Sequence, residues 1–481
     1  MGERLELKKS LIEPVYPQTE PNQPIDLGTV AVQFAHEGKT YQEMAHVTMR
    51  FLPGDQLLFV IPAKNDSPQN AKHQPMTADQ IKAALCPAFH LDNKWDGQLE
   101  LTDKGVVLDV LERGSGGDYG TVTFIPRRSA AKVTPKHDAI LAATFHLFNF
   151  PKFHGPDDYT IIRGEPPLQG RKLCDRSILK ADGWIITIAA MDKTDDLCEA
   201  LDRQGGYIVT HMGRIEREDG SAFTSDQLDD ILRCMHYFLS FALGRWAGVA
   251  LPVGLDKAGN RVFEEWGTPI VAAGARHGTC SWFDDIHAEL LSEVFGGFMV
   301  LWKDKTWSAA FREALHWYLG ANERGTGITV EMGLILAQTA LELLAWTHCV
   351  QSRKMISADA FEPRGLSAAD KIRLLASSLG IPLDIPASLP ALRAKRGSRW
   401  QDAADAITGI RNAVVHPRVK KNVLHDSYYQ AWNLSMWYLD MVLLRLCRHT
   451  GKYANRLVTP RWAGQVESVP WTKSESGKVG D

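Results

Sequence analysis

Residues 400–417 read WQDAADAITGIRNAVVHP. Apolar side chains recur every three or four positions along this stretch, at Trp400, Ala403, Ile407, Ile410 and Val414. That spacing is typical of a helix that packs one face on a core. Pro417 disfavours the helical conformation of the residue before it, so we expect the helix to end near His416. The pattern predicts an amphipathic helix inside a larger helical domain.

The C-terminal end of this helix carries the run RNAVVHP, residues 411–417. Asn412 and His416 are four residues apart, so we expect them to be neighbours on a face that points away from the core. Arg411 lies at the edge of the apolar stripe, where its long side chain can bring the guanidinium group round to the polar face. The negative end of the helix dipole favours a protonated His416, which suits a group that must donate a proton.

An earlier helix is predicted from EMGLILAQTALELLAW, residues 331–346, which is apolar nearly all round. Gln338 and Glu342 are four residues apart and share one narrow polar stripe. A carboxylate on such a helix is costly unless it is paired, and we expect the partly buried Arg411 to be its partner. Two interpretations therefore stay open: a structural ion pair between Arg411 and Glu342, or a cluster of reactive side chains.

The helical pattern covers most of the second half of the chain. It begins near Phe223 and predicts helices around residues 225–247, 283–302, 306–320, 329–351, 367–379, 400–416 and 426–450. Ser367 followed by Asp370 is close to a capping box, and Gly380 gives a C-terminal stop. We expect three parts here: a helical connecting region at 221–305, an all-α bundle at 306–452 and a C-terminal tail at 453–481.

The first half has a different pattern. Residues 1–24 contain four prolines among polar residues and predict an extended lead-in. Residues 25–220 contain short β-branched and aromatic runs separated by turn residues, such as DQLLFVIP and GWIITIAAM. They predict a β-rich domain, a sandwich or a barrel. The fold class expected for the whole chain is therefore α+β, with the β-rich domain first and the helical bundle last.

Composition limits the class of protein. The formal net charge of −3 argues against a molecule that attracts nucleic acid as a whole, so any basic surface is local. Residues 395–425 supply one, with seven Lys or Arg against two acidic residues. The apolar runs are shorter than the ~20 residues that span a bilayer, and the N-terminus lacks the apolar stretch of a signal peptide. We expect a cytoplasmic protein without membrane contact.

Metal-ligand residue types occur at two places, but neither forms a complete set. They are His277, Cys280 and His287 in one stretch, and His137, His146 and His154 in another. Neither has a fourth partner in register, so we expect no metal and no other cofactor. The seven cysteines are scattered, without a CxxC pair, and are expected to be reduced.

The helical half resembles the HEPN superfamily, and in particular the ApeA-like HEPN proteins of bacteria. The resemblance covers about residues 306–450 and rests on the order of ALELL, KIRLL, LGIP, RNAVVHP and a long closing helix. It places Arg411, Asn412 and His416 at the RNxxxH positions of that family, and Glu342 at an acidic position of its earlier helix. It implies a metal-independent endoribonuclease, usually dimeric, that often acts in defence against phage or as a toxin.

Two hypotheses follow. In the first, His416 serves as acid or base, Arg411 offsets charge on the phosphate, and Asn412 orients substrate or imidazole. The RNA, with tRNA as one candidate, is then held by Arg399, Arg418, Lys420 and Lys421, while Gln338 and Glu342 support the site. In the second, the helices form a non-cleaving interaction module, and the β-rich domain recognises a ligand or a phage-derived trigger.

We also expect a homodimer through the HEPN-like domain, because one RNxxxH motif supplies one imidazole and two would let separate groups act as acid and base; in the non-cleaving alternative the helices only dimerise. The last helix supports this with more apolar positions than a lone surface helix requires, at Tyr428, Trp432, Met436, Leu439, Leu443 and Leu446.

Overall fold

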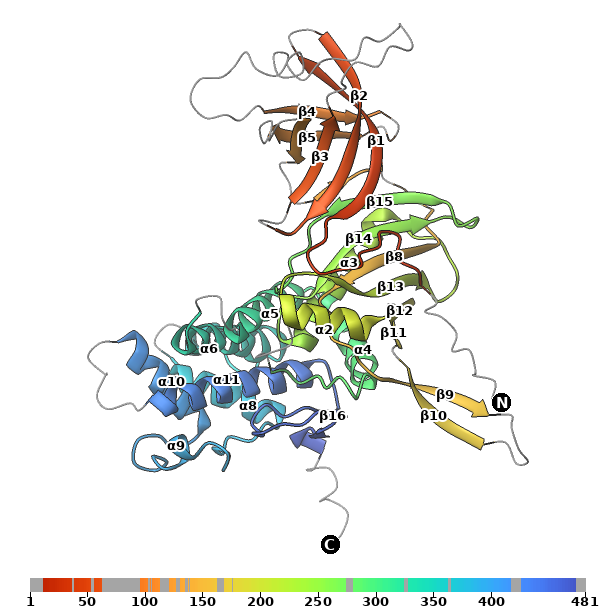
Figure 1. The fold of residues 1–481 in the computed structure, drawn as a ribbon. Helices are drawn as coiled ribbons and strands as arrows, with labels where there is room; N and C mark the ends of the chain where they lie inside the picture. Colours follow the sequence, from red (N-terminus) through yellow and green to blue (C-terminus); the bar gives the residue numbers. More distant parts are fainter. Residues whose placement is uncertain are drawn as a thin grey trace, which may run out of the picture. The chain divides into compact units, whose positions relative to one another are not determined.

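The chain forms two compact units in a computed structural model. The structure describes residues 12–472 except 37–38, 53–55, 63–95, 103, 105, 113–120, 127–129, 135–136, 138, 162–167, 175, 274–279, 324–327, 362–364 and 417–424. The first unit comprises residues 1–150, 188–231 and 248–275, and the second comprises 151–187, 232–247 and 276–481. Strands dominate the N-terminal half and helices the C-terminal half (Figure 1), which confirms the α+β class.

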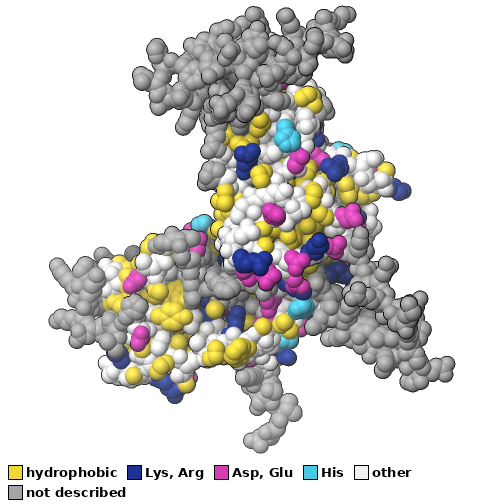
Figure 2. Space-filling model, in the orientation of Figure 1, with side chains coloured by type: hydrophobic (Ala, Val, Ile, Leu, Met, Phe, Trp, Pro, Cys, Tyr) yellow, Lys and Arg dark blue, Asp and Glu magenta, His cyan; other side chains and the backbone are white. Residues whose placement is uncertain are grey.

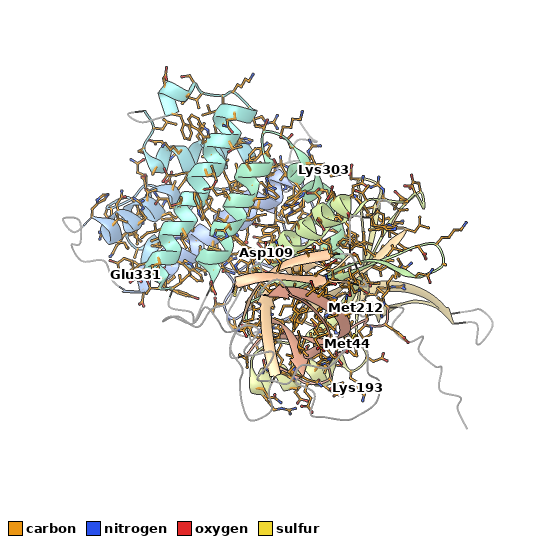
Figure 3. All side chains as sticks on the ribbon, turned by 90° about the horizontal axis from the view of Figure 1, so that it is seen from above. Met44, Asp109, Lys193, Met212, Lys303 and Glu331 are labelled. Carbon is orange, nitrogen blue, oxygen red and sulfur yellow. The ribbon has the colours of Figure 1, made fainter. Side chains whose placement is uncertain are left out.

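Six antiparallel strands form a closed barrel in the order β1-β2-β3-β6-β5-β4. They are β1 (Ile25–His36), β2 (Lys39–Arg50), β3 (Gln56–Pro62), β4 (Asp96–Leu101), β5 (Val106–Glu112) and β6 (Thr121–Pro126). Alternate residues of β2 point inward and outward, as the strand repeat requires. Ala45 and Val47 are fully buried, whereas Met44, labelled in Figure 3, is 52% exposed. The predicted β-rich domain therefore begins with a barrel.

A seven-stranded sheet follows the barrel, in the order β11-β12-β13-β8-β14-β15-β7. Its strands are β7 (Ala130–Lys132), β8 (Ala142–Phe148), β11 (Arg176–Ala181), β12 (Trp184–Ala190), β13 (Val209–Arg217), β14 (Gly248–Leu255) and β15 (Arg261–Gly267). Every residue of β8 is buried, because β13 and β14 pair with it on either side. A separate hairpin pairs β9 (Gly155–Ile161) with β10 (Leu168–Cys174).

The segment 221–305 differs from its prediction as a helical region. It holds α3 (Ser225–Leu243) and α4 (Glu289–Lys303), but β14 and β15 lie between these helices. The turn between the two strands is closed by the carboxylate of Asp256, which accepts hydrogen bonds from the backbone N–H groups of Ala258 and Asn260 at 2.8 Å. The predicted helices at 225–247 and 283–302 left the stretch between them unassigned within the helical region, although its turn residues indicate a hairpin.

The helical part of the second unit agrees closely with the predicted elements. It consists of α5 (Ser308–Asn322), α6 (Val330–Trp346), a π-helical turn (Thr347–Ser352), α7 (Ala358–Phe361), α8 (Ala368–Leu379), α9 (Pro390–Arg393), α10 (Ala403–Val415) and α11 (His425–Leu446). The caps predicted for α8 are confirmed, because Ser367 accepts from the N–H of Asp370 and Gly380 is left-handed with φ 70°. α11 packs against α6 and α10 (Figure 1) and is buried over residues 431–440.

Both ends of the described chain are anchored to the core, and residues 12–24 have no helix or strand, as the predicted extended lead-in requires. At the N-terminal end Ile12 and Tyr16 are buried, and the Tyr16 hydroxyl accepts from the indole N–H of Trp266 at 3.0 Å. At the C-terminal end Arg456 is buried and donates to both carboxylate oxygens of Asp440 on α11. Prolines and polar residues predict an extended path in these segments, but not the anchors that attach them to the core.

One helical segment of the described chain, Val330–Ser352, is long and apolar enough to cross a membrane by length and composition alone: it has 23 residues, and its most apolar 18-residue window has a mean hydropathy of 1.3. However, 61% of its most apolar window is buried inside the protein. The core helix of a folded domain passes the same test, and α6 packs against α5, α8, α10 and α11.

A candidate active site at the end of helix α10

The N-terminus of α10 is fixed by charged groups that sequence inspection did not single out. Asp402 is its N-cap, and its side chain accepts from the N–H of Asp405 at 2.9 Å. Arg373 on α8 donates to Asp402 at 2.6 Å and to Asp405 at 2.9 Å. Burial raises the pKa of Asp402, but the hydrogen bonds from Arg373 and the backbone outweigh it, so that the pKa is lowered overall. The carboxylate is therefore charged when it caps the helix.

The apolar stripe predicted for this helix faces the core. Trp400, Ala403, Ile407 and Ile410 are at most 4% exposed, while Val414 is half-buried. The stripe sets the rotation of α10 about its own axis, and that rotation leaves Arg411 and Asn412 half-buried beside the core and His416 exposed.

The three motif residues lie in the last turn and at the end of α10. His416 is the C-cap: it leaves helical geometry with φ −107° and ψ 107°, and its N–H donates to the Asn412 carbonyl at 2.9 Å. The His416 side chain is exposed, whereas those of Arg411 and Asn412 are half-buried. The predicted position of His416 at the helix C-terminus is confirmed.

The Arg411 guanidinium has little compensation for its charge. Its Nη1 donates to the Asn412 side-chain oxygen at 3.4 Å, at the long end of hydrogen-bond distances. Its Nε is buried and has no hydrogen-bond partner in the described part of the chain. The expected ion pair between Arg411 and Glu342 is not among those that the described residues form, so this expectation was wrong.

Glu342 has other partners. Its carboxylate lies 3.8 Å from the ammonium group of Lys371 on α8, and it accepts from the side-chain amide of Gln338 at 2.8 Å. Lys371 is only 6% exposed, and its ammonium lies 4.9 Å from the centre of the Phe361 ring. The predicted adjacency of Gln338 and Glu342 is confirmed. The cation comes from α8 and not from α10. The sequence could not predict this, because several helices pack on α6 and the sequence does not rank them.

An open groove runs along the outer face of α6, beside Glu342. Its volume is about 340 Å³, and its lining residues are Trp317, Thr339, Glu342, Leu343 and Trp346. Two further apolar residues lie on α6: Leu336 is half-buried, and Met332 is 48% exposed. Figure 2 shows apolar side chains gathered over this part of the helices, and Glu331, labelled in Figure 3, marks the first turn of α6. A helix that is apolar nearly all round gave no sign in the sequence of this exposed groove.

The predicted RNA-binding residues are only partly described. Arg399 is exposed, with its guanidinium 5.7 Å from the centre of the Trp400 ring. Arg418, Lys420 and Lys421, together with Pro417 of the motif, lie outside the described residues.

The histidines considered as ligands have other surroundings. His146 is buried: its Nε2 accepts from the N–H of Tyr16 at 3.1 Å, and its Nδ1 lies 3.2 Å from the Leu251 carbonyl. His287 hydrogen bonds to Glu289 at 2.9 Å, and His277 lies outside the described residues. In the part of the chain that the structure describes, no group of three or more His, Cys, Asp or Glu side chains has a geometry that could hold a metal ion.

Comparison with known proteins gives matches for two regions of the chain, one of which contains the motif. Residues 304–468 match the family model of the YopA C-terminal domain, and residues 136–276 match that of the YopA central domain. Both matches are to YopA. The SPbeta prophage-derived uncharacterized protein YopA of Bacillus subtilis (strain 168) is 29% identical over 334 residues, covering 65% of this chain and 71% of that protein. No solved structure matches this chain.

The two matched regions include the candidate site but not the barrel. The C-terminal match contains α5 to α11 and with them Arg411, Asn412 and His416. The central match contains most of the seven-stranded sheet, whereas the barrel strands β1 to β6 lie outside both regions. The candidate site therefore lies in the similar part of the chain, and the barrel does not.

Proposed function

We propose that this protein is a metal-independent endoribonuclease of HEPN type, with Arg411, Asn412 and His416 as its catalytic residues. The observation that carries the proposal is the Arg411 guanidinium, which is half-buried with an unpartnered Nε and without a neighbouring carboxylate among the described residues. A charge-assisted hydrogen bond from an anion would satisfy it, and a phosphodiester is an anion with the matching geometry.

The residue types suit cleavage of RNA at its own 2′-hydroxyl. That group must lose a proton to attack the phosphorus, and the 5′-oxygen must gain one as its bond to phosphorus breaks. The exposed imidazole of His416 can do each in turn, while Arg411 offsets the charge on the phosphate oxygens. Asn412 orients the imidazole or the substrate. The products are a 2′,3′-cyclic phosphate and a free 5′-hydroxyl.

RNA is the partner that this chemistry requires, and tRNA is one candidate substrate. The basic residues Arg399, Arg418, Lys420 and Lys421 would contact its phosphates, and Gln338 and Glu342 would support the site from α6. We place the protein in the cytoplasm, without membrane contact. The prophage origin of the Bacillus relative supports a role in conflict between phage and host, as a defence or toxin effector with a phage-derived trigger.

We also propose a homodimer formed through the outer face of α6. Met332, Leu336, Thr339, Leu343 and Trp346 recur every three or four residues along it. The series is centred close to Thr339, so a second copy running antiparallel brings Met332 opposite Trp346 and Leu336 close to Leu343. Such a self-complementary stripe is what a two-fold interface needs. This surface also favours the second candidate function, a non-cleaving interaction module.

The test of the enzymatic proposal uses purified full-length protein, excess EDTA and a panel of RNAs that includes total tRNA, with and without phage lysate. We expect cleavage that leaves 2′,3′-cyclic phosphate ends, because no metal-bound water takes part. His416→Ala should abolish cleavage with a melting temperature close to that of the unaltered protein, since the side chain is exposed at a helix end.

The matched control is His316→Ala, another exposed histidine of the helical unit, which should retain full cleavage. Cleavage that requires Mg²⁺, or that persists undiminished in His416→Ala, would contradict the enzymatic proposal. If the unaltered protein cleaves no RNA of the whole panel, the result would favour the interaction module.

A further inference from the structure

Ser427, in the first turn of α11, has a buried hydroxyl group without a hydrogen-bond partner. The residue is 0% exposed, and its Oγ forms no hydrogen bond in the described part of the chain. Ser435, equally buried on the same helix, donates its hydroxyl to the Ala431 carbonyl at 2.7 Å, one turn earlier. A buried polar group without a partner costs stability and is rare in native proteins. Ser427 therefore differs from an ordinary core serine.

Arg411 on α10 holds the complementary group. Its Nε–H is a donor that is buried and has no partner among the described residues, whereas a serine hydroxyl oxygen can accept. Ala404 and Ile407 precede Arg411 on one face of α10, at intervals of three and four residues, and both are fully buried. The Arg411 side chain therefore leaves α10 on the side that packs against α6, α8 and α11.

α10 packs against α11 (Figure 1), and contacts at the start of α10 show which part of α11 it faces. The Tyr438 hydroxyl of α11 donates to the Pro382 carbonyl at 2.7 Å. The N–H of Ala403, the first residue of α10, donates to the carbonyl of the next residue, Leu383, at 2.9 Å. The start of α10 therefore lies beside the middle of α11.

The two helices run in opposite directions. Nine residues join the end of α10 at Val415 to the start of α11 at His425. If the helices were parallel, these two ends would lie ~37 Å apart, given ~1.5 Å of rise per residue from the level that Ala403 shares with Tyr438. The ten steps from residue 415 to residue 425 span at most ~36 Å when fully extended. A parallel pair would thus need a connection stretched beyond its full length.

The antiparallel arrangement brings Arg411 and Ser427 to neighbouring levels. Arg411 lies eight residues beyond Ala403, and Ser427 lies eleven residues before Tyr438. These separations correspond to ~12 Å and ~17 Å along the two helix axes, and the difference of ~5 Å is within the length of an arginine side chain. Eleven residues are also about three turns of helix, so Ser427 is on the same face of α11 as Tyr438.

We propose that Ser427 positions Arg411 for the proposed ribonuclease reaction, on which this inference rests. In the RNA complex the Ser427 hydroxyl oxygen accepts from the Arg411 Nε–H, and the two terminal amino groups of the guanidinium are then directed at the phosphodiester. A change of side-chain rotamer brings the two atoms together. Ser427 is too deeply buried to touch the RNA, so it is a positioning residue that acts through Arg411.

A second buried acceptor, the Oε1 of Gln338 on α6, also has no partner in the described chain. Its position argues against a contact with Arg411. The Gln338 amide donates to Glu342, whose carboxylate lies 3.8 Å from the ammonium group of Lys371 on α8. Two residues further along α8, Arg373 donates to the N-cap of α10, at the end opposite Arg411. Gln338 is therefore linked to the first turn of α10 and not to its last.

The experiment measures the affinity of the full-length protein for labelled total tRNA by fluorescence anisotropy. All variants carry His416→Ala, so that the RNA is not cleaved during the measurement. Ser427→Ala should weaken binding about tenfold, which corresponds to the loss of a hydrogen bond to a charged group. In protein that also carries Arg411→Met, Ser427→Ala should have no further effect, because Ser427 acts only through Arg411. The melting temperature should not fall in Ser427→Ala, since an unsatisfied hydroxyl is removed.

Ser435→Ala is the matched control, because it removes an equally buried serine of α11 whose hydroxyl is already satisfied. It should leave the dissociation constant for tRNA unchanged. Any effect of Gln338→Met should be the same with and without Arg411→Met, since Gln338 does not act through Arg411.

The inference is overturned if Ser427→Ala binds tRNA as tightly as its parent, if its effect persists in the Arg411→Met protein, or if tRNA does not bind at all. Any of these results, in a protein that cleaves RNA when His416 is intact, overturns the role of Ser427 and not the ribonuclease. Conversely, coupling between Ser427 and Arg411 in a protein that never cleaves RNA overturns the ribonuclease and supports Ser427 as the residue that positions Arg411 for binding.

Discussion

At the scale of single residues, the arginines of the helical unit differ in how their charge is balanced. Arg456 is buried and donates to Asp440, and Arg373 donates to three carboxylates. Arg411 has one long hydrogen bond to Asn412 and none to a carboxylate in the described chain. A half-buried cation without a counter-charge costs stability. The fold thus gains little from Arg411, as we expect for a residue that acts in the proposed reaction.

This difference predicts opposite effects of one substitution at two sites. Arg411→Met removes an uncompensated charge and should leave the free energy of unfolding unchanged or raise it by up to about 1 kcal/mol. Arg373→Met leaves Asp370, Asp402 and Asp405 without their partner and should lower it by about 1–2 kcal/mol, a value reduced because these groups are partly exposed. Urea unfolding followed by circular dichroism measures both.

A loss of stability in Arg411→Met as large as that in Arg373→Met would identify Arg411 as a structural residue. In that case the absence of its ion pair with Glu342 would need another explanation, and the catalytic assignment would lose its main support.

His146 gives a second prediction at this scale, because it is buried in the first unit as a neutral ring. Burial lowers its pKa to about 4, although the hydrogen bond to the Leu251 carbonyl raises the pKa and so offsets part of this effect. In the unfolded chain its pKa is near ~6.5, so below that pH the unfolded state binds the proton more tightly and the native state is destabilised. The loss should be about 2 kcal/mol near pH 5 and approach about 3 kcal/mol below pH 4.

Urea unfolding at several pH values checks this, with two variants for comparison. His146→Gln keeps a donor and an acceptor but does not titrate, so the dependence on pH between about 4 and 6.5 should become shallower. His46→Gln, at a side chain that is 48% exposed, should retain the full dependence. An unchanged pH dependence in His146→Gln would mean that other groups control acid unfolding.

At the scale of elements, the sequence predicts best what neighbouring residues determine. The limits of α8 follow from Ser367 and Gly380, and the end of α10 follows from Pro417 acting on His416. Each effect spans one turn of helix, and each is confirmed. The site itself was partly predictable for the same reason, because the spacing of Asn412 and His416 fixes their faces on α10.

Elements and contacts that depend on distant partners were predicted less well. β14 and β15 were missed, because they fall between the helices predicted at 225–247 and 283–302 and only their pairing with β8 and β7 makes them strands. The predicted partner of Glu342 was wrong because four helices, α5, α8, α10 and α11, pack on α6 and the sequence does not say which supplies the cation. The pairing with Lys371 is a tertiary outcome.

At the scale of the whole molecule, the sequence patterns did not predict how the stretches of the chain are divided between the two units. Each unit is built from separate stretches, and residues 232–247 return to the second unit between two segments of the first. Composition changes gradually along such a chain, so a single β-to-α boundary near residue 220 was the simplest interpretation. The apolar surplus of α11 was also misread: Trp432, Met436, Leu439 and Leu443 are at most 3% exposed, so the core of one chain accounts for them.

The proposed dimer therefore rests on α6, and its outer face gives the last prediction. Light scattering of the full-length protein at micromolar concentration should give twice the mass of one chain. Leu336→Glu and Leu343→Glu should each shift the protein to monomer, because at a two-fold interface one substitution introduces two buried charges. Val300→Glu is the matched control: Val300 is 53% exposed on α4, outside the stripe, and its replacement should leave the dimer intact. If the unaltered protein is monomeric with and without RNA, or if Val300→Glu dissociates it while the two leucine variants stay dimeric, then α6 is not the interface and a composite site of two imidazoles is excluded there.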